Sequence, residues 1–309
     1  ARLLTSGGIT ANSWATCGDF LLDPQADATA VLSLVAEALN QAPWPWLCLS
    51  PVAYESPRWR LLVEAARYHG LDAIVVPSGQ VGQVRIEGDW DDYRTSWSAN
   101  HRRYLRKAQR RADQTSGLAL DVHTAVSPQE VERLMRVGCE IEDRSWKGTA
   151  GTSVLRAPGM FDWHLHQAKR LADDGQLQLS FLIHGELPIA FEYGYRGKAT
   201  YFSHKVGYDP AYAHFSPGQL LRALLLEHFF AARDVVLVDY WGPLSDATAK
   251  FATHQYPVGK ILIAPRRFLS RALLAGYAAV RPYWRNVRSW LVQGLKNERR
   301  EAVGPTVTR

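Results

Sequence analysis

The chain has 309 residues, of which 47% are hydrophobic and 21% charged, and its formal net charge is +6. This composition excludes an intrinsically disordered chain and leaves room for two modest domains or one large one. The positive charge is concentrated at 102–111 and 266–300, so the expected partners are phosphorylated cofactors, anionic lipid or RNA.

Cysteine spacing and hydropathy limit the expected cellular location and the kinds of site in the protein. Cys17, Cys48 and Cys139 lie far apart and predict neither a disulfide framework nor a cysteine zinc site, and no metal is expected. No apolar run reaches the roughly 18 residues that a membrane span needs. We therefore expect a cytoplasmic protein.

The first ninety residues alternate between short apolar strands and helical patterns. Strands are predicted at 20–22, 46–49 and 73–76, and helices at 26–40 and 57–69. This alternation is typical of an α/β half-domain. No motif in this part of the chain indicates a chemical function.

A strongly basic helix is predicted over 91–115. Trp97 and Leu105 belong to its apolar stripe, whereas the arginines lie largely outside that stripe. One interpretation is a solvated helix that bridges two domains. The other is a surface that meets an acidic or phosphorylated substrate, with Arg102 and Arg103 as the candidate contacts.

The second half has a regular order of elements. We expect a strand, two helices, three antiparallel strands joined by tight turns, and then helix, strand, helix and strand. In chain order these elements are predicted at 118–123, 128–142, 161–174, 177–184, 188–196, 199–206, from 216 onward, 235–238, 247–253 and 260–263.

The helix that follows the third antiparallel strand has a distinctive entrance. Ser216 is a suitable N-cap, Pro217 suits the first turn, and Gly218 keeps side-chain bulk away from the free amides. A helix N-terminus of this kind attracts phosphate. The alternative is an ordinary capped helix in a β-α-β unit.

Four segments of the second half carry a family resemblance. They are RSWKGTAGT at 144–152, LIHGELPIA at 182–190, GYDPAYAHFSPGQLL at 207–221, and the lone Lys250 after a strand that bears an aspartate. Together and in this order they resemble the CelD-like acetyltransferases of the GNAT superfamily. That family is associated with cellulose and exopolysaccharide synthesis and is related to the Fem peptidyltransferases.

The resemblance implies an α/β (α+β) GNAT acyl-CoA N-acyltransferase fold in a tandem arrangement. The parts expected are a degenerate N-terminal GNAT-like half-domain (1–90), a basic bridging helix (91–116), a GNAT domain (117–265) and a basic amphipathic tail (266–309).

In this fold two parallel strands splay apart, and the acyl-thioester arm of coenzyme A lies between them. The resemblance therefore implies acetyl-CoA or another acyl-CoA as donor. The approach AYAHFSPGQ departs from the usual glycine-rich phosphate loop, which keeps aminoacyl-tRNA, the donor of Fem relatives, as an alternative. The residues implied for cofactor binding are Ser203, Lys205, Ser216, Pro217, Gly218 and Gln219.

Acyl transfer requires a base, a donor to the oxyanion and an acid for the leaving thiolate. Strand alternation places Ile189, Phe191 and Tyr193 on one face, so Glu192 lies on the other between small residues that leave room for a ligand. Partial burial there would raise the pKa of Glu192 toward that of a useful base. An exposed carboxylate paired with Lys205 is the alternative.

Four further residues complete the catalytic candidates, each with a structural alternative. His204 titrates near neutral pH or serves only as a structural hydrogen-bonding residue. Asp239 and Lys250 reach the rim of the sheet as catalytic groups or form one salt bridge. Tyr208 either protonates the thiolate or shapes the turn at Pro210.

Two segments are candidates for binding a substrate or contacting a membrane. Trp146 and Lys147, in a Gly-rich loop, suit an acidic or sugar-bearing substrate, unless the tryptophan plugs the core. The tail at 266–300 interleaves arginines with Trp and Leu, with a break at Pro282, as helices at a membrane surface do. Packing back on the domain is the alternative.

The sequence thus predicts transfer of an acyl group from acyl-CoA to an amine or hydroxyl of a cell-envelope or polysaccharide-related acceptor. The expected location is the cytoplasm, with peripheral contact at the inner face of the membrane through the tail. An aminoacyl-tRNA-dependent Fem-like transferase and a non-catalytic, membrane-docked scaffold of a polysaccharide synthesis complex are the alternatives.

Overall fold

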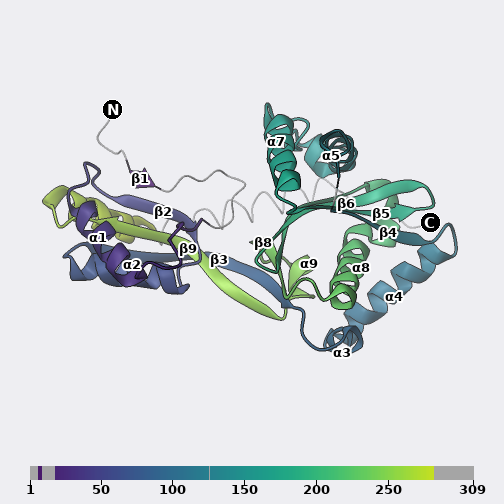
Figure 1. Cartoon of the computed structure of the whole chain (residues 1–309), viewed down its shortest axis with the longest axis horizontal. Helices are drawn as coiled ribbons and strands as arrows, with labels where there is room; N and C mark the ends of the chain where they lie inside the picture. Colours follow the sequence, from purple (N-terminus) through teal and green to yellow (C-terminus); the bar gives the residue numbers. More distant parts are fainter. Residues whose placement is uncertain (1–5, 9–17, 125, 282–309) are drawn as a thin grey trace, which may run out of the picture. The chain divides into compact units, whose positions relative to one another are not determined.

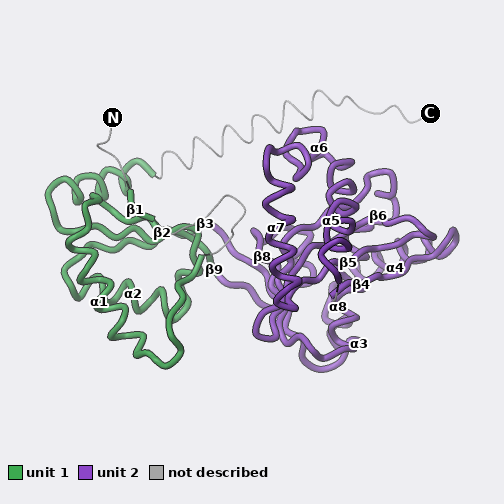
Figure 2. The backbone as a smooth tube through the Cα atoms, turned by 45° about the horizontal axis from the view of Figure 1, so that its top comes forward, with its two compact units in different colours: residues 1–78, 257–309 green, residues 79–256 purple. Residues whose placement is uncertain are grey.

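The computed structural model describes residues 6–8, 18–124 and 126–281, which fall into two compact units (Figure 2). Unit 1 contains residues 1–78 and 257–309, and unit 2 contains residues 79–256. Two strands, β3 (Asp72–Arg85) and β9 (His254–Ala264), carry the chain from one unit to the other. The division therefore differs from the boundaries predicted after residues 90 and 265, because it falls within strands.

Unit 1 is a small α/β layer. β2 (Leu47–Val52) pairs parallel with β1 (Gly7–Gly8) and antiparallel with β9. Its helices are α1 (Ala28–Asn40) and α2 (Pro57–Tyr68), and their apolar faces pack into one core with β2 and β9. The strand predicted at 20–22 is not formed. Phe20 instead packs its ring 4.0 Å from that of Trp59 in this core.

The described part of the basic tail packs against the rest of unit 1. Residues 268–281 are helical, and Leu274 and Tyr277 join a core with Val76 and Leu262. This agrees with the alternative in which the tail folds back, although Phe268 remains exposed. The rest of the predicted tail, including Pro282, lies outside the described residues.

Unit 2 contains a mixed sheet covered by helices on both faces. From one edge, the strands follow the order β3, β8 (Leu237–Pro243), β7 (Thr200–Tyr208), β6 (Leu187–Gly197), β5 (Leu177–His184) and β4 (Leu118–His123). Among these neighbours β7 and β8 are parallel and the other pairs are antiparallel. The predicted order of elements in the second half is confirmed.

The helices of unit 2 form two layers (Figure 1). One face of the sheet carries α5 (Pro128–Asp143) and α7 (Met160–Asp173), joined through the single turn α6 (Trp146–Thr149). The other carries α3 (Trp90–Thr95), α4 (Ala99–Asp113) and α8 (Pro217–Ala232). The short elements η1 (Pro210–Phe215) and α9 (Asp246–Ala249) lie on either side of α8 in the chain.

The basic stretch predicted as one helix is two helices. Asp89 caps α3 by accepting from Asp92 N at 2.8 Å, and Ser98 caps α4 by accepting from His101 N at 3.2 Å. These side-chain caps compete with a continuous helix at the junction. Tyr104 on α4 is exposed, and its hydroxyl pairs with that of Ser216.

A glycine sets how closely α5 approaches the sheet. A Cβ on Gly138 would overlap the ring of Phe191 on β6, and both residues are buried. We expect Gly138→Ala to lower the free energy of unfolding by about 1–3 kcal/mol, because overpacking forces the helix away from the strand. Urea unfolding measures this. Gly79→Ala, where an added Cβ meets no atom within 4 Å, is the control. Equal effects of the two changes would show that helix seating does not depend on Gly138.

Candidate functional site

The two parallel strands of unit 2 separate after a short paired stretch. β7 and β8 pair only between Thr200–Phe202 and Leu237–Asp239. β7 then continues to Tyr208 while its opposite edge stays paired with β6. Beyond Phe202, the edge of β7 that faces β8 has no strand partner among the described residues. Backbone N–H and C=O groups on an edge without a strand partner are of the kind that an extended ligand can pair with.

A β-bulge in β7 lies just past the point of separation. Tyr193 pairs with Lys205 and Gly194 with Ser203, which leaves His204 as the extra residue. Such a bulge changes the alternation of side chains. As a result, both His204 and Lys205 lie on the face that α5 and α7 cover.

His204 lies on β7 two residues after its pairing with β8 ends. Its ring lies 5.5 Å from that of His164 on α7 and 5.3 Å from that of Tyr193. Burial lowers the pKa of His204 to about 4, with Lys205 as a smaller cause. Both ring nitrogens are buried and have no hydrogen-bond partner within the described chain. The ring is therefore neutral near pH 7 and has a lone pair available for a proton.

Beside His204 lies a buried charge cluster that sequence reasoning missed. The Glu142 side chain is almost fully buried, and its Oε1 lies 2.7 Å from Lys147 Nζ and 3.5 Å from Lys205 Nζ. Its Oε2 accepts a hydrogen bond from Val154 N at 3.0 Å. Burial opposes ionisation of Glu142, but the two lysines hold its pKa below the usual value.

This cluster changes how the predicted substrate contacts are interpreted. The Lys147 ammonium is held by Glu142 and also donates to Val206 O at 3.4 Å. Its neighbour Trp146 is 70% exposed, so it does not plug the core. The signal for Glu142 was present in the sequence, because this acidic residue falls on the buried stripe of α5 that includes Met135.

Glu192 lies on the opposite face of the sheet, beneath α8. It is 3% exposed, and Tyr201 donates its hydroxyl to Glu192 Oε1 at 3.0 Å. Burial raises the pKa of Glu192, while Arg222, Ser203 and Tyr201 oppose that shift. The predicted room for a ligand at Gly194 is filled, because a Cβ there would overlap the Tyr201 hydroxyl.

Two details of the predicted β6 face are corrected. Ile189 packs in the core under α8 with Ala190, whereas Phe191 packs under α5. The cause is a register shift between β5 and β6 at Leu182 and Ile183, which breaks strict alternation. The carboxylate of Glu192 forms no ion pair with Lys205 in the described structure.

The α8 side of the sheet also holds buried polar atoms that protein groups do not satisfy. They are Arg222 Nε and Gln219 Oε1 on α8 and the Tyr240 hydroxyl on β8, none of which has a hydrogen-bond partner within the described residues. The Arg222 guanidinium lies 5.0 Å from the centre of the Tyr240 ring. Because buried polar groups are normally paired, this set is suited to a polar ligand between α8 and the separated strands. Sequence reasoning missed Arg222 and Tyr240.

The entrance of α8 differs in detail from its prediction. Ser216 is at the N-cap position but has φ +54°, and its side chain makes no cap bond. Its hydroxyl instead pairs with that of Tyr104 on α4. A Cβ on Gly218 would lie 3.5 Å from Tyr208, so Tyr208, which is 40% exposed, lies beside Pro217 and Gly218 at this entrance.

Within the described residues, Asp239 and Lys250 do not form the salt bridge that was the structural alternative for them. Asp239 ends the paired stretch of β8, where it accepts hydrogen bonds from Gln83 Nε2 at 2.9 Å and Trp241 N at 2.7 Å. Burial raises its pKa. Lys250 is exposed and lies close enough to His101 to help burial lower the pKa of that ring to about 4.

Arg102 and Arg103 lie on α4, away from the His204 cluster. Arg102 donates to the carbonyls of Thr95 and Trp97, the latter at 2.6 Å, and Arg103 donates to Asn100 Oδ1 at 2.8 Å. The structure therefore places the predicted residues other than Asp239 and Lys250 in three sets: the His204 side, the Glu192 side with the α8 entrance, and α4.

The described residues contain neither a metal-binding group nor a membrane-spanning helix. No group of three or more His, Cys, Asp or Glu side chains is placed to hold a metal ion among them. Nor does any helix in these parts of the chain have the length and apolar character needed to cross a membrane.

Comparison with known proteins identifies the fold. Residues 99–246 match the model of the acetyltransferase (GNAT) domain family. No curated protein matches the chain. The crystal structure of FemX superposes with a TM-score of 0.51 at 9% identity, over 77% of this chain and 78% of FemX.

Two more solved structures resemble the chain. A conserved protein of unknown function from Bacteroides thetaiotaomicron VPI-5482 gives a TM-score of 0.52 at 12% identity, over 78% of this chain and 77% of that one. The C-terminal domain (DUF2156) of a putative lysylphosphatidylglycerol synthetase from Agrobacterium fabrum gives 0.49 at 15% identity, over 82% and 77%. The predicted GNAT fold of mixed α/β class is confirmed, and the CelD-like assignment stays a prediction.

Proposed function

We propose that the protein transfers an acyl group from an acyl-CoA thioester to an amine or hydroxyl of its acceptor. One observation carries the proposal: β7 and β8 part after Phe202, and on the α8 side of the sheet Arg222, Gln219 and Tyr240 have buried polar atoms with no hydrogen-bond partner in the described residues. A gap between parallel strands with free backbone groups on one side suits an extended ligand that contains amides.

The residues present fit the donor in three ways. The edge of β7 that β8 leaves beyond Phe202, beginning at Ser203, would pair with the amides of the pantetheine arm. Amides around Gly218, at the N-terminus of the 16-residue helix α8, would hold the pyrophosphate. The buried polar atoms named above would then gain hydrogen-bond partners.

In the mechanism proposed, the acceptor approaches from the face that α5 and α7 cover. Its nitrogen or oxygen attacks the thioester carbon, and His204 accepts the proton that the nucleophile loses. Free N–H groups of β7 stabilise the oxyanion while the C–S bond breaks. Tyr208, beside the α8 entrance, is the proposed proton donor to the departing thiolate. We also propose Asp239 and Lys250 as catalytic groups at the rim of the sheet.

For the acceptor, we propose a cell-envelope or polysaccharide-related molecule. The exposed indole of Trp146 supports this, because aromatic faces suit sugar-bearing substrates. A cytoplasmic location with peripheral membrane contact belongs to the same proposal. The aminoacyl-tRNA alternative is supported by the exposed basic side chains of α4, and the scaffold alternative predicts liposome binding without turnover.

A ligand titration tests the proposal. Acetyl-CoA or a long-chain acyl-CoA is expected to bind saturably, and Gly218→Trp to weaken that binding at least tenfold with little change in melting temperature, because the indole blocks the helix entrance. Gly79→Trp adds the same bulk at an open position and is the control. Binding of aminoacyl-tRNA but of no thioester would select the Fem-like alternative. Equal loss of binding and stability would make Gly218 a structural residue only.

A further inference from the structure

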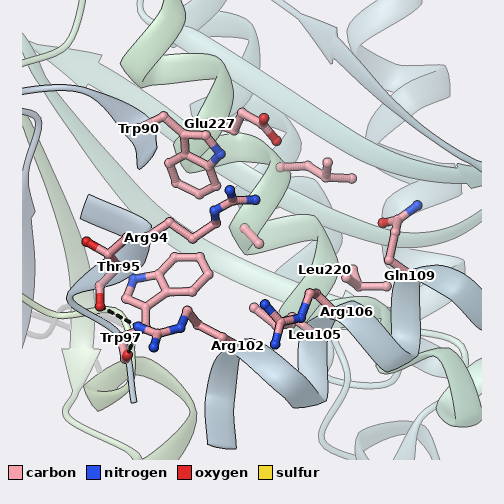
Figure 3. A pocket seen from close by; sticks show the side chains of 12 residues that line it. Trp90, Arg94, Thr95, Trp97, Arg102, Leu105, Arg106, Gln109, Leu220 and Glu227 are labelled. Atoms are coloured by element: carbon pink, nitrogen blue, oxygen red, sulfur yellow. Dashed lines mark hydrogen bonds between the residues drawn. The ribbon is translucent and has the colours of Figure 1, made fainter. Parts of the chain in front are cut away.

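A cavity lies in unit 2, between α3, α4 and the outer face of α8 (Figure 3). Its volume is about 520 Å³, within the range of roughly 300–1,000 Å³ typical of small-molecule sites. The residues that line it are Trp90, Arg94, Thr95, Trp97, Arg102, Leu105, Arg106, Gln109, Leu220, Ala223, Leu224 and Glu227.

This α3–α4–α8 pocket is separate from the opening between β7 and β8. Leu221, Leu225 and Phe229 on α8 are buried against the sheet. Ala223 and Leu224, on the other side of the same helix, line the pocket. The body of α8 therefore lies between the two sites, and a ligand in the pocket need not be a substrate of acyl transfer.

One part of the pocket is apolar. Six of its lining residues are apolar, and the indoles of Trp90 and Trp97 stand beside the opening with their rings 5.4 Å apart (Figure 3). Leu105 from α4 and Leu224 from α8 supply aliphatic surface. Such a lining favours a hydrocarbon chain over a fully hydrated ligand.

The other part of the pocket is basic. Arg94 pairs with Asp91 at 2.7 Å, and Arg102 is held by the two backbone carbonyls of α3 and its C-terminal turn. The side chain of Arg106 forms no ion pair or hydrogen bond within the described chain, nor does the side chain of Glu227, which also lines the pocket. The three arginines carry three positive charges, and Asp91 and Glu227 carry two negative charges. The net charge of the group is therefore +1, and one carboxylate on a ligand would neutralise it. A guanidinium binds a carboxylate through two parallel hydrogen bonds.

We infer that the α3–α4–α8 pocket binds a single-chain fatty acid, with its carboxylate at Arg106 and its hydrocarbon chain along Trp90, Leu105 and Leu224. The combination of an apolar lining with one uncompensated guanidinium carries this inference. It extends beyond the proposed acyl transfer, since it concerns a separate site and needs no turnover.

Isothermal titration with laurate, kept below its micellar concentration, tests the inference on the full chain. Saturable binding at one site is expected. Dodecanol lacks the charge and acetate lacks the chain, so each should bind at least tenfold more weakly. If laurate does not bind, or if acetate binds equally well, the inference fails.

Matched variants locate the site. Arg106→Gln should weaken laurate binding about tenfold, because the carboxylate loses its partner. Arg110→Gln removes the same charge from the same helix, but Arg110 is exposed and does not line the pocket, so binding should be unchanged. Leu224→Glu, which puts a negative charge among the apolar residues, should abolish binding. Equal weakening by Arg106→Gln and Arg110→Gln would indicate general attraction to a basic surface and would overturn the inference.

Should Leu224→Glu unfold, the comparison of Arg106→Gln with Arg110→Gln still decides, since both residues are exposed. Laurate that protects wild type but not Arg106→Gln from thermal unfolding would be a second supporting result. Binding of anionic vesicles without binding of monomeric laurate would replace the pocket with a membrane surface.

Discussion

Glu142→Gln is expected to lower the free energy of unfolding by about 3–5 kcal/mol at pH 7, the scale for removing one partner of a buried ion pair. The change leaves the ammonium groups of Lys147 and Lys205 beside a neutral side chain, and Lys205 is only 7% exposed. Burial already lowers the pKa of Lys205, so we expect this lysine to lose its proton in the variant. Chemical denaturation measures the difference.

Glu140→Gln is the matched control for this prediction. Glu140 lies on the same helix but is exposed, and it forms no ion pair in the described structure. The pH dependence gives a second test. Because the folded protein holds the pKa of Glu142 below its usual 4.5, the ionised carboxylate stabilises above that pH and loses its effect as pH falls through the folded value. The gap between wild type and Glu142→Gln should therefore close in acid. Equal stability losses for Glu140→Gln and Glu142→Gln at pH 7 would contradict the prediction.

His204→Gln is expected to reduce acyl transfer by roughly a hundredfold or more, the usual contribution of a general base. Glutamine retains polarity at the bulge but cannot take a proton at neutral pH. Single-turnover measurements with saturating acyl-CoA isolate the chemical step from product release. Donor binding by the variant should be near that of wild type.

The pH profile follows from the pKa of about 4 that burial imposes on His204. The ring is neutral above that value, so its protonation should reduce kcat/KM only as pH falls toward 4. Loss at higher pH would reflect protonation of an amine acceptor. Glu192→Gln is the comparison variant, because Glu192 is buried on the opposite face and is bonded to Tyr201. A larger loss in Glu192→Gln than in His204→Gln would move the base to Glu192.

The order of elements was accessible to sequence reasoning because it depends on local patterns. Hydrophobic periodicity and turn residues predicted the helix–meander–helix order of the second half, and that order is confirmed. Periodicity failed where an extra residue enters a strand. The bulge at His204 and the register shift that turns Ile189 toward α8 depend on pairing with a neighbouring strand, which a single strand does not encode.

Residues distant in sequence account for the other differences at the site. Ser216 has the preferences of an N-cap, yet its hydroxyl bonds to Tyr104, 112 positions earlier. The sequence shows that Glu142 is an acidic residue on a buried helix stripe. It does not show which base pairs with it, because Lys205 on β7 is 63 positions away. The discontinuous unit 1 was missed for the same reason, because β9 completes a sheet that begins at β2.

That discontinuity has a consequence for synthesis on the ribosome. Residues 79–256 are contiguous, whereas β2 must wait for its partners in β9, residues 259–263, which are made after all of them. At about 5–20 residues per second, those 178 residues take roughly 10–35 s to translate. During this interval the apolar side chains of Trp59 and Leu62, buried in the finished protein, lack the strand that completes their core. The part of unit 1 that precedes β3 therefore completes its core only after unit 2 has been synthesised, and until then its apolar side chains are exposed to aggregation.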